Sequence, residues 1–191
     1  MGTTINAFLQ KTSQSYRDVL HYFFSFPEQA TSLNDLTRNV KRSKTSTKGA
    51  VIHLIKEGFL KKELIGNAWR ISADTKNDFM ITRKIPSNLG LLYEAGIVGK
   101  VYKKIPEARA IILFGSYRWG TDNEKSDIDI AVEVLGNQPL AIEKLCVFDT
   151  LGVIKNVIVN LHSFSRNKID LNVFTNIANG IVLDGLLEVH P

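Results

Sequence analysis

Three aspartates in otherwise apolar segments are the residues of this sequence best suited to catalysis. Asp127 and Asp129 lie in the segment 126–134, and Asp170 lies in the segment 168–174. Burying an unpaired carboxylate is costly, so each of these side chains needs a partner. One shared divalent cation would serve all three, because hard cations prefer carboxylate oxygens as ligands. We therefore predict a triad in which Asp127, Asp129 and Asp170 are both the metal ligands and the catalytic residues.

A Gly-Ser turn precedes the first two aspartates. Residues 110–114 are a continuous apolar run that predicts a buried strand, and Gly115 and Ser116 follow directly. A glycine lets the backbone approach a ligand closely, while the Ser116 hydroxyl and the adjacent amides can hold phosphate oxygens. In an extended strand Asp127 and Asp129 share one face, about 7 Å apart, so both can reach the same cation.

The elements that must position these residues form a small α/β core. Residues 110–114, 126–134 and 168–174 are expected as strands of a mixed sheet with helices on one side. Residues 139–161 are expected to supply a helix between the second and third strands, and residues 87–104 a connector helix packed on the sheet. The predicted domains are an N-terminal domain at 1–75, a connector at 76–108 and the catalytic core at 109–191.

The N-terminal segment has the pattern of a small helical module with a hairpin. Helices are expected at residues 13–26 and 31–40, and the second opens with a hydroxyl cap followed three residues later by an acid. A polar turn at 41–48 precedes a third helix. Two extended runs around the Gly-Asn pair at 66–67 then predict a β-hairpin.

The basic excess lies entirely in the first part of the chain. Residues 1–80 contain 12 Lys and Arg against 7 Asp and Glu, whereas residues 81–191 contain 12 of each. This asymmetry predicts an anionic partner for the N-terminal domain. No acid interrupts the sequence between Asp35 and Glu57. The residues of this basic segment that we expect to bind duplex DNA are Lys41, Arg42, Lys44, Thr45, Ser46 and Lys48. The alternative is a solvated basic face on a fold that serves for protein contacts.

Composition excludes several classes of protein. With 44% hydrophobic and 23% charged residues the chain is too apolar to be disordered, and it has no apolar run long enough to span a bilayer, so no membrane partner is expected. Residues 1–18 lack the pattern of a secretory signal, which predicts a cytoplasmic protein. Cys146 is the only cysteine, which excludes an intramolecular disulfide and a cysteine-rich zinc site. We expect it to be a small buried side chain in a helix.

Several other polar residues are given no catalytic role. Asp122, Glu124 and Glu133 are expected to be surface acids. His53 and His162 have no partner at the spacing of metal ligands.

The catalytic segments carry a family resemblance. The run LFGSYRWGTDNEKSDIDIAVEV resembles the signature of the nucleotidyltransferase superfamily related to DNA polymerase β: an apolar strand, Gly-Ser, a spacer, then Asp-x-Asp in a strand. The segment KIDLNVF is similar to the strand that carries the third aspartate, and NIANGIVLDGLLE resembles the closing helix of minimal prokaryotic nucleotidyltransferases. VIHLIKEGFLKKELIGNAWRIS resembles a winged helix-turn-helix, and prokaryotic proteins exist in which such a domain is fused to this core.

This resemblance implies a metal-dependent reaction. A nucleotidyl group, AMP being expected, would pass from a nucleoside triphosphate to an acceptor hydroxyl on a protein or small molecule. Gly115 and Ser116 would bind the triphosphate, and Asp127 and Asp129 would hold two Mg²⁺ ions, or Mn²⁺, about 4 Å apart. Asp170 would complete the second metal site and help to deprotonate the acceptor.

One position departs from the family pattern. Members often carry a basic residue directly before the glycine at the position of Gly120, and here Trp119 stands there with Arg118 one step earlier. Two interpretations stay open for Arg118, contact with the triphosphate or a plain surface position. Trp119 is expected to pack over the turn rather than to stack on a base.

Two functions of different classes follow. The first is an active nucleotidyltransferase that also binds DNA through its winged helix, resembling the antitoxins of two-gene modules that modify a helical toxin-like partner protein. Its acceptor would come from that partner or from the second subunit of a homodimer, because minimal members lack an acceptor domain. The second is a DNA-binding transcriptional regulator whose core binds nucleotide or a partner without catalysis.

Overall fold

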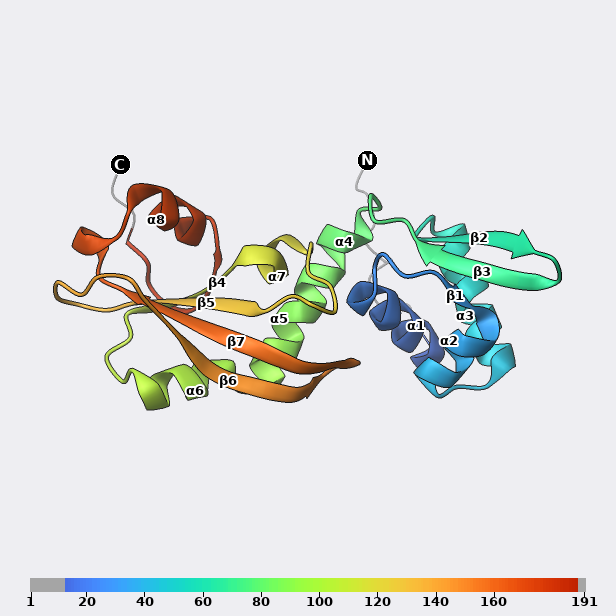
Figure 1. Cartoon of the computed structure of the whole chain (residues 1–191), viewed down its shortest axis with the longest axis horizontal. Coiled ribbons are helices and arrows are strands. Elements are labelled where there is room, and N and C mark those ends of the chain that lie inside the picture. Colours follow the sequence, from blue (N-terminus) through green and yellow to red (C-terminus); the bar gives the residue numbers. More distant parts are fainter. Residues whose placement is uncertain (1–12, 189–191) are drawn as a thin grey trace, which may run out of the picture. The chain divides into compact units, whose positions relative to one another are not determined.

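The structure is a computed structural model, and it describes residues 13–188 (Figure 1). Its contacts divide the chain into a first unit, Met1–Asn77, and a second unit, Asp78–Pro191. Most of the connector expected at 76–108 therefore belongs to the second unit. The expectation about a secretory signal concerns mainly residues that lie outside the described range. Between residues 13 and 188, no helix has the length and apolarity that crossing a bilayer requires.

The described part of the first unit is built from short helices and strands. They are α1 (Gln14–Ser25), β1 (Thr31–Ser32), α2 (Leu33–Val40), α3 (Lys44–Lys56), β2 (Leu60–Ile65) and β3 (Ala68–Ala73). β3 pairs antiparallel with both β1 and β2, so the order in the sheet is β1-β3-β2. Phe23, Leu36 and Leu54, one from each helix, are fully buried and form the centre of the core. The winged helix-turn-helix prediction rests on this order of helices and hairpin.

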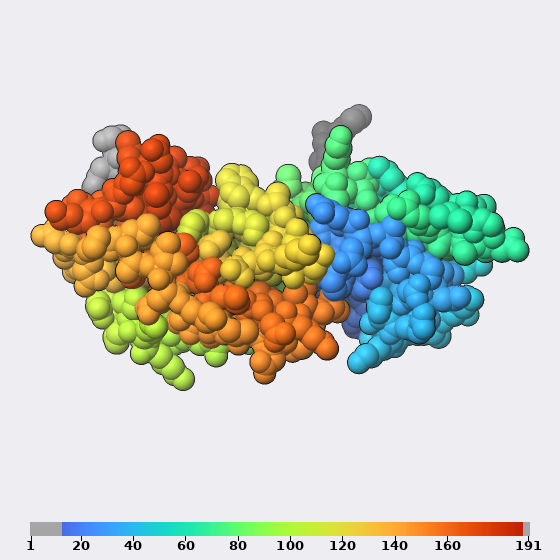
Figure 2. All heavy atoms as spheres, in the orientation of Figure 1, coloured from blue at the N-terminus to red at the C-terminus, as the bar shows by residue number. Residues whose placement is uncertain are grey.

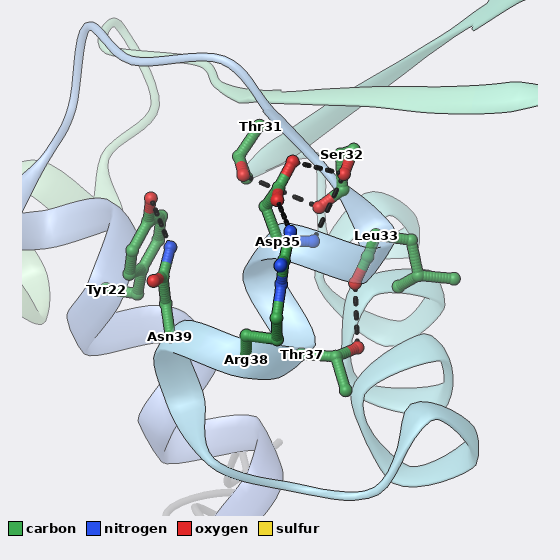
Figure 3. Close-up of polar contacts among 8 residues, drawn as sticks. All are labelled: Tyr22, Thr31, Ser32, Leu33, Asp35, Thr37, Arg38 and Asn39. Carbon is green, nitrogen blue, oxygen red and sulfur yellow. Dashed lines mark hydrogen bonds and ion pairs between the residues drawn. The ribbon is translucent and has the colours of Figure 1, made fainter.

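The amino end of α2 carries the cap that the sequence predicts (Figure 3). The Ser32 hydroxyl accepts the Asp35 N–H at 3.1 Å and donates to Asp35 Oδ2 at 2.6 Å. The Asp35 carboxylate also pairs with Arg38 in the next turn. Thr31 and Ser32 form β1 rather than the first turn of the helix, so α2 begins two residues later than expected.

α3 begins inside the segment 41–48, which was expected to be a polar turn. Ser43 is its N-cap, and the Ser43 hydroxyl accepts the Ser46 N–H at 3.2 Å. Only Thr47 of the first turn is fully buried. Because the rest of that turn is polar and exposed, no apolar periodicity marks it, and the predicted turn is wrong from Lys44 onward. The basic residues of this segment therefore lie mainly on a helix.

The second unit contains one mixed sheet with flanking helices, as the fold class predicts. Its elements are α4 (Phe79–Thr82), α5 (Lys84–Glu94), α6 (Ile97–Lys104), β4 (Ala110–Phe114), α7 (Gly115–Trp119), β5 (Ile128–Glu133), β6 (Ala141–Leu151), β7 (Ile154–Phe164), a 3₁₀ turn (Arg166–Lys168), α8 (Leu171–Ala178) and β8 (Ile181–Gly185). The strand order is β6-β7-β5-β4-β8. β5 and β7 are parallel, while the other neighbouring strands in the described range are antiparallel. The expected connector helix is two helices, α5 and α6.

Helices cover both faces of this sheet (Figure 1). Val101 of α6 and Ile130 of β5 belong to one buried cluster on one face, whereas Ile177 of α8 and Ala131 of β5 belong to another on the opposite face. Since side chains alternate along a strand, Asp129 lies on the α8 face. The expectation of helices on one side only is wrong.

Three segments take a conformation different from the expected one. Residues 139–161 form most of the hairpin of β6 and β7 rather than a helix, so Cys146 lies in a strand. The strand expected at 168–174 is replaced by the start of α8, and part of the expected closing helix is the strand β8. Within the segment 139–161, β-branched residues dominate positions 153–159, and these residues favour the extended conformation over a helix.

Candidate functional site

The turn after β4 brings backbone against the second aspartate of the Asp-x-Asp pair. β4 and β5 are antiparallel, and Phe114 at the end of β4 is opposite Asp129. Gly115 follows with φ +70°, and a Cβ at this position would lie 2.7 Å from Asp129 Oδ2. Glycine alone combines this backbone conformation with this close approach. The Gly-Ser pair, which was predicted to be a turn and forms the start of α7, is therefore brought together with Asp129.

β7 adds two polar neighbours to the aspartate pair. Asp127 is exposed immediately before β5, and Asn160 Nδ2 donates to Asp127 Oδ2 at 3.3 Å. His162 Nε2 lies 3.1 Å from Oδ1 of Asp129, whose side chain is 29% exposed. The His162 ring packs edge-on against Phe114, with 4.9 Å between the ring centroids. His162, which was given no role, therefore contacts the site.

Asn160 was missed because residues 139–161 were interpreted as a helix, and His162 was set aside because the sequence shows no partner for it at the spacing of metal ligands. In the strand that forms there, Val159 and Leu161 are buried on one face. Asn160 and His162 alternate with them and so lie on the other face, beside the aspartates. This alternation of apolar and polar residues was the signal available in the sequence.

Asp170 does not join this cluster. It is the N-cap of α8, where Oδ1 accepts the N–H of Asn172 at 2.9 Å and of Val173 at 3.3 Å. β7 runs parallel to β5 and ends at Phe164, opposite Glu133. The chain therefore reaches Asp170 from the end of the sheet remote from the Asp-x-Asp pair. The predicted triad is reduced to its first two members.

The remaining donors fit one divalent cation better than two. Between residues 13 and 188, no three His, Cys, Asp or Glu side chains are grouped as a metal site requires. Mg²⁺ commonly binds one or two protein carboxylates and completes its coordination with water and phosphate oxygens. Asp127 and Asp129 suit one such ion. The strand next to β5 presents Asn160 opposite Asp129, so the residue facing the pair there is an amide and not a further carboxylate.

Arg118 and Trp119 pack together at the end of α7. The Arg118 guanidinium lies 3.8 Å from the centroid of the Trp119 ring, and Nε donates to the carbonyl oxygen of Asn179 at 2.7 Å. Trp119 remains 53% exposed. Arg118 thus joins α7 to the carboxyl end of α8, where a cation interacts favourably with free carbonyl groups.

Two acids expected at the surface are buried. Asp122 and Glu133 are each 2% exposed. Glu133 Oε1 accepts a hydrogen bond from Arg166 Nε at 2.9 Å, and Asp122 forms an ion pair with Lys84. Burial raises the pKa of the Asp122 carboxyl and lowers the pKa of the Lys84 ammonium group, because both charged forms lose their hydration.

α3 carries most of the residues predicted to bind DNA. The exposed residues on its first turns are Lys44, Thr45, Ser46 and Lys48. Lys41 and Arg42 precede the helix, and both are exposed. Arg42 is held by an ion pair with Asp18 of α1, with 2.5 Å between Nε and Oδ2. Four of the six predicted residues therefore lie at the amino end of α3, and the other two lie in the turn before it.

The β2–β3 hairpin extends this basic face. The ammonium groups of Lys48 and Lys62 lie 5.4 Å and 4.5 Å from the centroid of the Trp69 ring. A groove of about 260 Å³ between α3 and the hairpin is lined in part by Lys44, Asn67 and Trp69. Lysines, amides and a partly exposed aromatic ring are groups that bind phosphates and bases. Trp69 and Lys62 were not singled out by the sequence.

Comparison with known proteins bears on the second unit. No curated protein matches the chain. Residues 98–184 match the family model described as Polymerase beta, Nucleotidyltransferase, and this match supports assigning that part of the chain to the nucleotidyltransferase superfamily.

Proposed function

We propose that the second unit transfers a nucleotidyl group from a nucleoside triphosphate to an acceptor hydroxyl, with a divalent cation held by Asp127 and Asp129. The observation that carries this proposal is the close approach of Gly115 to the Asp129 carboxylate. A triphosphate lying over Gly115 and Ser116 would have its phosphate oxygens beside a cation bound by the two aspartates. The family match of residues 98–184 supports the same type of chemistry.

The neighbouring residues have separate tasks in this scheme. A bound Mg²⁺ or Mn²⁺ would neutralise the charge that develops on the phosphate oxygens. The Ser116 hydroxyl and the adjacent amides donate to those oxygens. His162 and Asn160 orient the carboxylates of Asp129 and Asp127 through the contacts described above, as partners of metal ligands commonly do.

The proposal is tested by transfer of label from nucleoside triphosphates labelled at the α-phosphate. The purified protein is incubated with Mg²⁺ or Mn²⁺ and each of the four nucleotides, alone and with candidate partner proteins or small hydroxyl compounds. We expect Asp127→Ala/Asp129→Ala to abolish transfer. Asp149→Ala, an exposed acid on β6, is the control and is expected to keep it. Transfer by the double variant at the wild-type rate would refute the site.

One observation favours a second function. The predicted third carboxylate, Asp170, caps α8, and β7 presents the amide of Asn160 beside the aspartate pair instead. A core of this kind can bind nucleotide and regulate DNA binding without turnover. Metal-dependent nucleotide binding by the wild type, with no transfer to any acceptor tried, would favour this regulator over the enzyme.

For the first unit we propose binding of duplex DNA by α3 and the β2–β3 hairpin. The support is the exposed basic end of α3 and the groove beside Trp69. Each phosphate contact releases counterions, so affinity should fall steeply with salt. A nucleotidyltransferase tethered to DNA in this way could act on a partner encoded at the same locus, as an antitoxin-type protein would.

The DNA proposal is tested by the slope of log affinity against log salt concentration. We expect Lys44→Gln/Lys48→Gln to weaken binding and to reduce the slope by about 2, one unit for each lysine that no longer neutralises a phosphate. The control Lys103→Gln/Lys125→Gln removes two exposed charges from the second unit and should leave the slope unchanged. Absence of wild-type binding at low salt would sink the proposal.

A further inference from the structure

A buried ion pair ties α5 to the loop that precedes the Asp-x-Asp pair. Lys84, the first residue of α5, is 1% exposed. Its Nζ lies 3.3 Å from Asp122 Oδ2 and also donates to the Asp122 carbonyl oxygen. One turn along α5, Asn88 Nδ2 donates to Asp122 Oδ1 at 2.8 Å and to the carbonyl oxygen of Tyr117 at 3.3 Å. Both carboxylate oxygens of Asp122 are thus held by one helix.

The same loop is anchored a second time at Gly120. This residue has φ +70°, and a Cβ on it would lie 2.1 Å from the carbonyl oxygen of Met80 in α4. The backbone of the loop therefore packs directly on the backbone of α4, which a residue with a side chain would prevent. The contact is independent of the ion pair, and both anchors lie within the connector expected at 76–108.

A tight, hydrogen-bonded turn connects the anchored Asp122 to Asp127. The Ser126 hydroxyl accepts the Asn123 N–H at 3.0 Å, and Asn123 Oδ1 accepts the Lys125 N–H at 2.9 Å. The Ser126 N–H closes the turn on the Asn123 carbonyl oxygen at 3.1 Å. The chain from Asp122 to Asp127 therefore has little freedom to move. This segment, between α7 and β5, reaches the surface of the second unit (yellow in Figure 2).

Stability alone gives little reason for such a pair. Two charges lose their hydration on burial, and apolar side chains of similar size often replace a buried ion pair without loss of stability. The shifts of both pKa values away from the charged forms reflect this loss of hydration. Charged partners joined by directed hydrogen bonds favour one geometry over others, which apolar side chains do less well. In this structure the charges and hydrogen bonds fix the arrangement of Asp122 relative to α5.

We propose that α4 and α5 form a clamp that positions Asp127 for its cation, with Lys84, Asn88 and Asp122 as positioning residues. The inference rests on the proposed function, because it assigns a purpose to the placement of Asp127. None of the three residues contacts substrate in this scheme. They act through the loop at residues 120–127.

The test separates positioning from stability by replacing the pair as a whole. Lys84→Met/Asp122→Leu leaves no unpaired charge, so its melting temperature should stay within about 5 °C of the wild type. The control Lys104→Met/Glu143→Leu removes an exposed ion pair that joins α6 to β6, with 2.9 Å between Nζ and Oε2. Amide hydrogen exchange is measured across the full-length protein. Mn²⁺ affinity is measured in the presence of a non-hydrolysable nucleoside triphosphate.

We expect amides at 120–127 in the paired variant to exchange about tenfold faster or more, with β5 unchanged, since local opening is released. Mn²⁺ binding should weaken by a similar factor, and transfer should fall about 100-fold, the loss that a displacement of about 1 Å can cause. The control should match the wild type. Asn88→Ala, which removes one donor and keeps the ion pair, should shift the same quantities in the same direction and serves if the paired variant does not fold.

Two results overturn the clamp: wild-type exchange at 120–127 in the substituted proteins, or faster exchange with unchanged Mn²⁺ affinity. Failure of the proposed function has a different signature. In that case the wild type itself binds no Mn²⁺ with nucleotide, and Asp127 has no cation to be positioned for, which also overturns the inference. The exchange data then still decide whether α5 fixes the loop.

Discussion

Asp129 and Asp170 each stand in an apolar segment, and composition does not distinguish them. Asp129 is part of a strand with neighbours on both sides, so pairing holds its carboxylate on the face of the sheet. Asp170 instead bonds to N–H groups two and three residues ahead. Asp followed by a helix-compatible segment is equally an N-cap signal. At the scale of the residue, the sequence therefore did not distinguish an aspartate in a strand from one that caps a helix.

Replacing Asp170 separates a helix cap from a metal ligand. Asp170→Ala should lower the free energy of unfolding by about 1 kcal/mol, because the first turn of α8 loses its cap. Label transfer and Mn²⁺ affinity should stay at wild-type values. Chemical denaturation and the transfer assay check both expectations. Loss of transfer by a folded Asp170→Ala protein would return Asp170 to the active site.

Gly115 offers a second test at this scale. Gly115→Ala forces a side chain into the left-handed region and against the Asp129 carboxylate. We expect a loss of about 1–3 kcal/mol in stability from the backbone strain, together with loss of transfer. Gly90→Ala is the matched control, because Gly90 lies in α5 with open space around it. That change should stabilise the protein by up to about 1 kcal/mol, and equal behaviour of the two variants would contradict the account.

At the scale of the element, local sequence patterns predicted the conformation correctly where a segment is buried throughout or is capped by its own residues. The continuous apolar run of β4 and the Ser32 cap of α2 are of this kind. β6 and β7 were mistaken for a helix because apolar residues in 139–161 also fit helical spacing. β8 was mistaken because only Leu183 of this strand is buried, and its extended conformation comes from pairing with β4. In both cases the deciding contacts are with strands outside the segment.

The hydrogen bonds of Asp35 at the amino end of α2 make the first unit sensitive to acid. Hydrogen bonds from Ser32 and then Arg38 lower the pKa of Asp35 below its ordinary value of 3.8. The stabilisation of the fold by the ionised Asp35 carboxylate is therefore fully present well above the ordinary pKa of 3.8. It is lost as the pH falls through the lower pKa of the folded state. Between about pH 5 and pH 2, the wild type should lose more stability than Asp35→Asn, whose amide does not titrate. Fluorescence of Trp69 in a Trp119→Phe background reports the transition, and parallel curves would contradict this assignment.

At the scale of the whole molecule, the strand order β6-β7-β5-β4-β8 was beyond prediction from one sequence. The parallel pairing of β5 with β7 places Ile128 opposite Val159, with a whole hairpin strand between them in the chain. No local pattern specifies that register, and it is this register that sets Asn160 and His162 beside the aspartates. The division of charge along the chain was visible directly, since it needs only counting.

The division into two units leads to an expectation about separability. Because each unit has its own core and its own proposed site, Asp127→Ala/Asp129→Ala should bind duplex DNA as the wild type does. Lys44→Gln/Lys48→Gln should keep transfer to an acceptor supplied in solution. Equilibrium DNA binding and label transfer on both variants check this. Loss of transfer in the lysine variant would show that the two activities are coupled.

The central claim is that the aspartate pair catalyses transfer of a nucleotidyl group. The most direct measurement compares one nucleoside triphosphate labelled at the α-phosphate with the same nucleotide labelled at the γ-phosphate. We expect the acceptor to gain the α label and the γ label to leave as pyrophosphate, with transfer lost in Asp129→Asn and kept in Asp170→Asn. Label from the γ-phosphate on the acceptor, or wild-type α transfer by Asp129→Asn, would contradict the central claim.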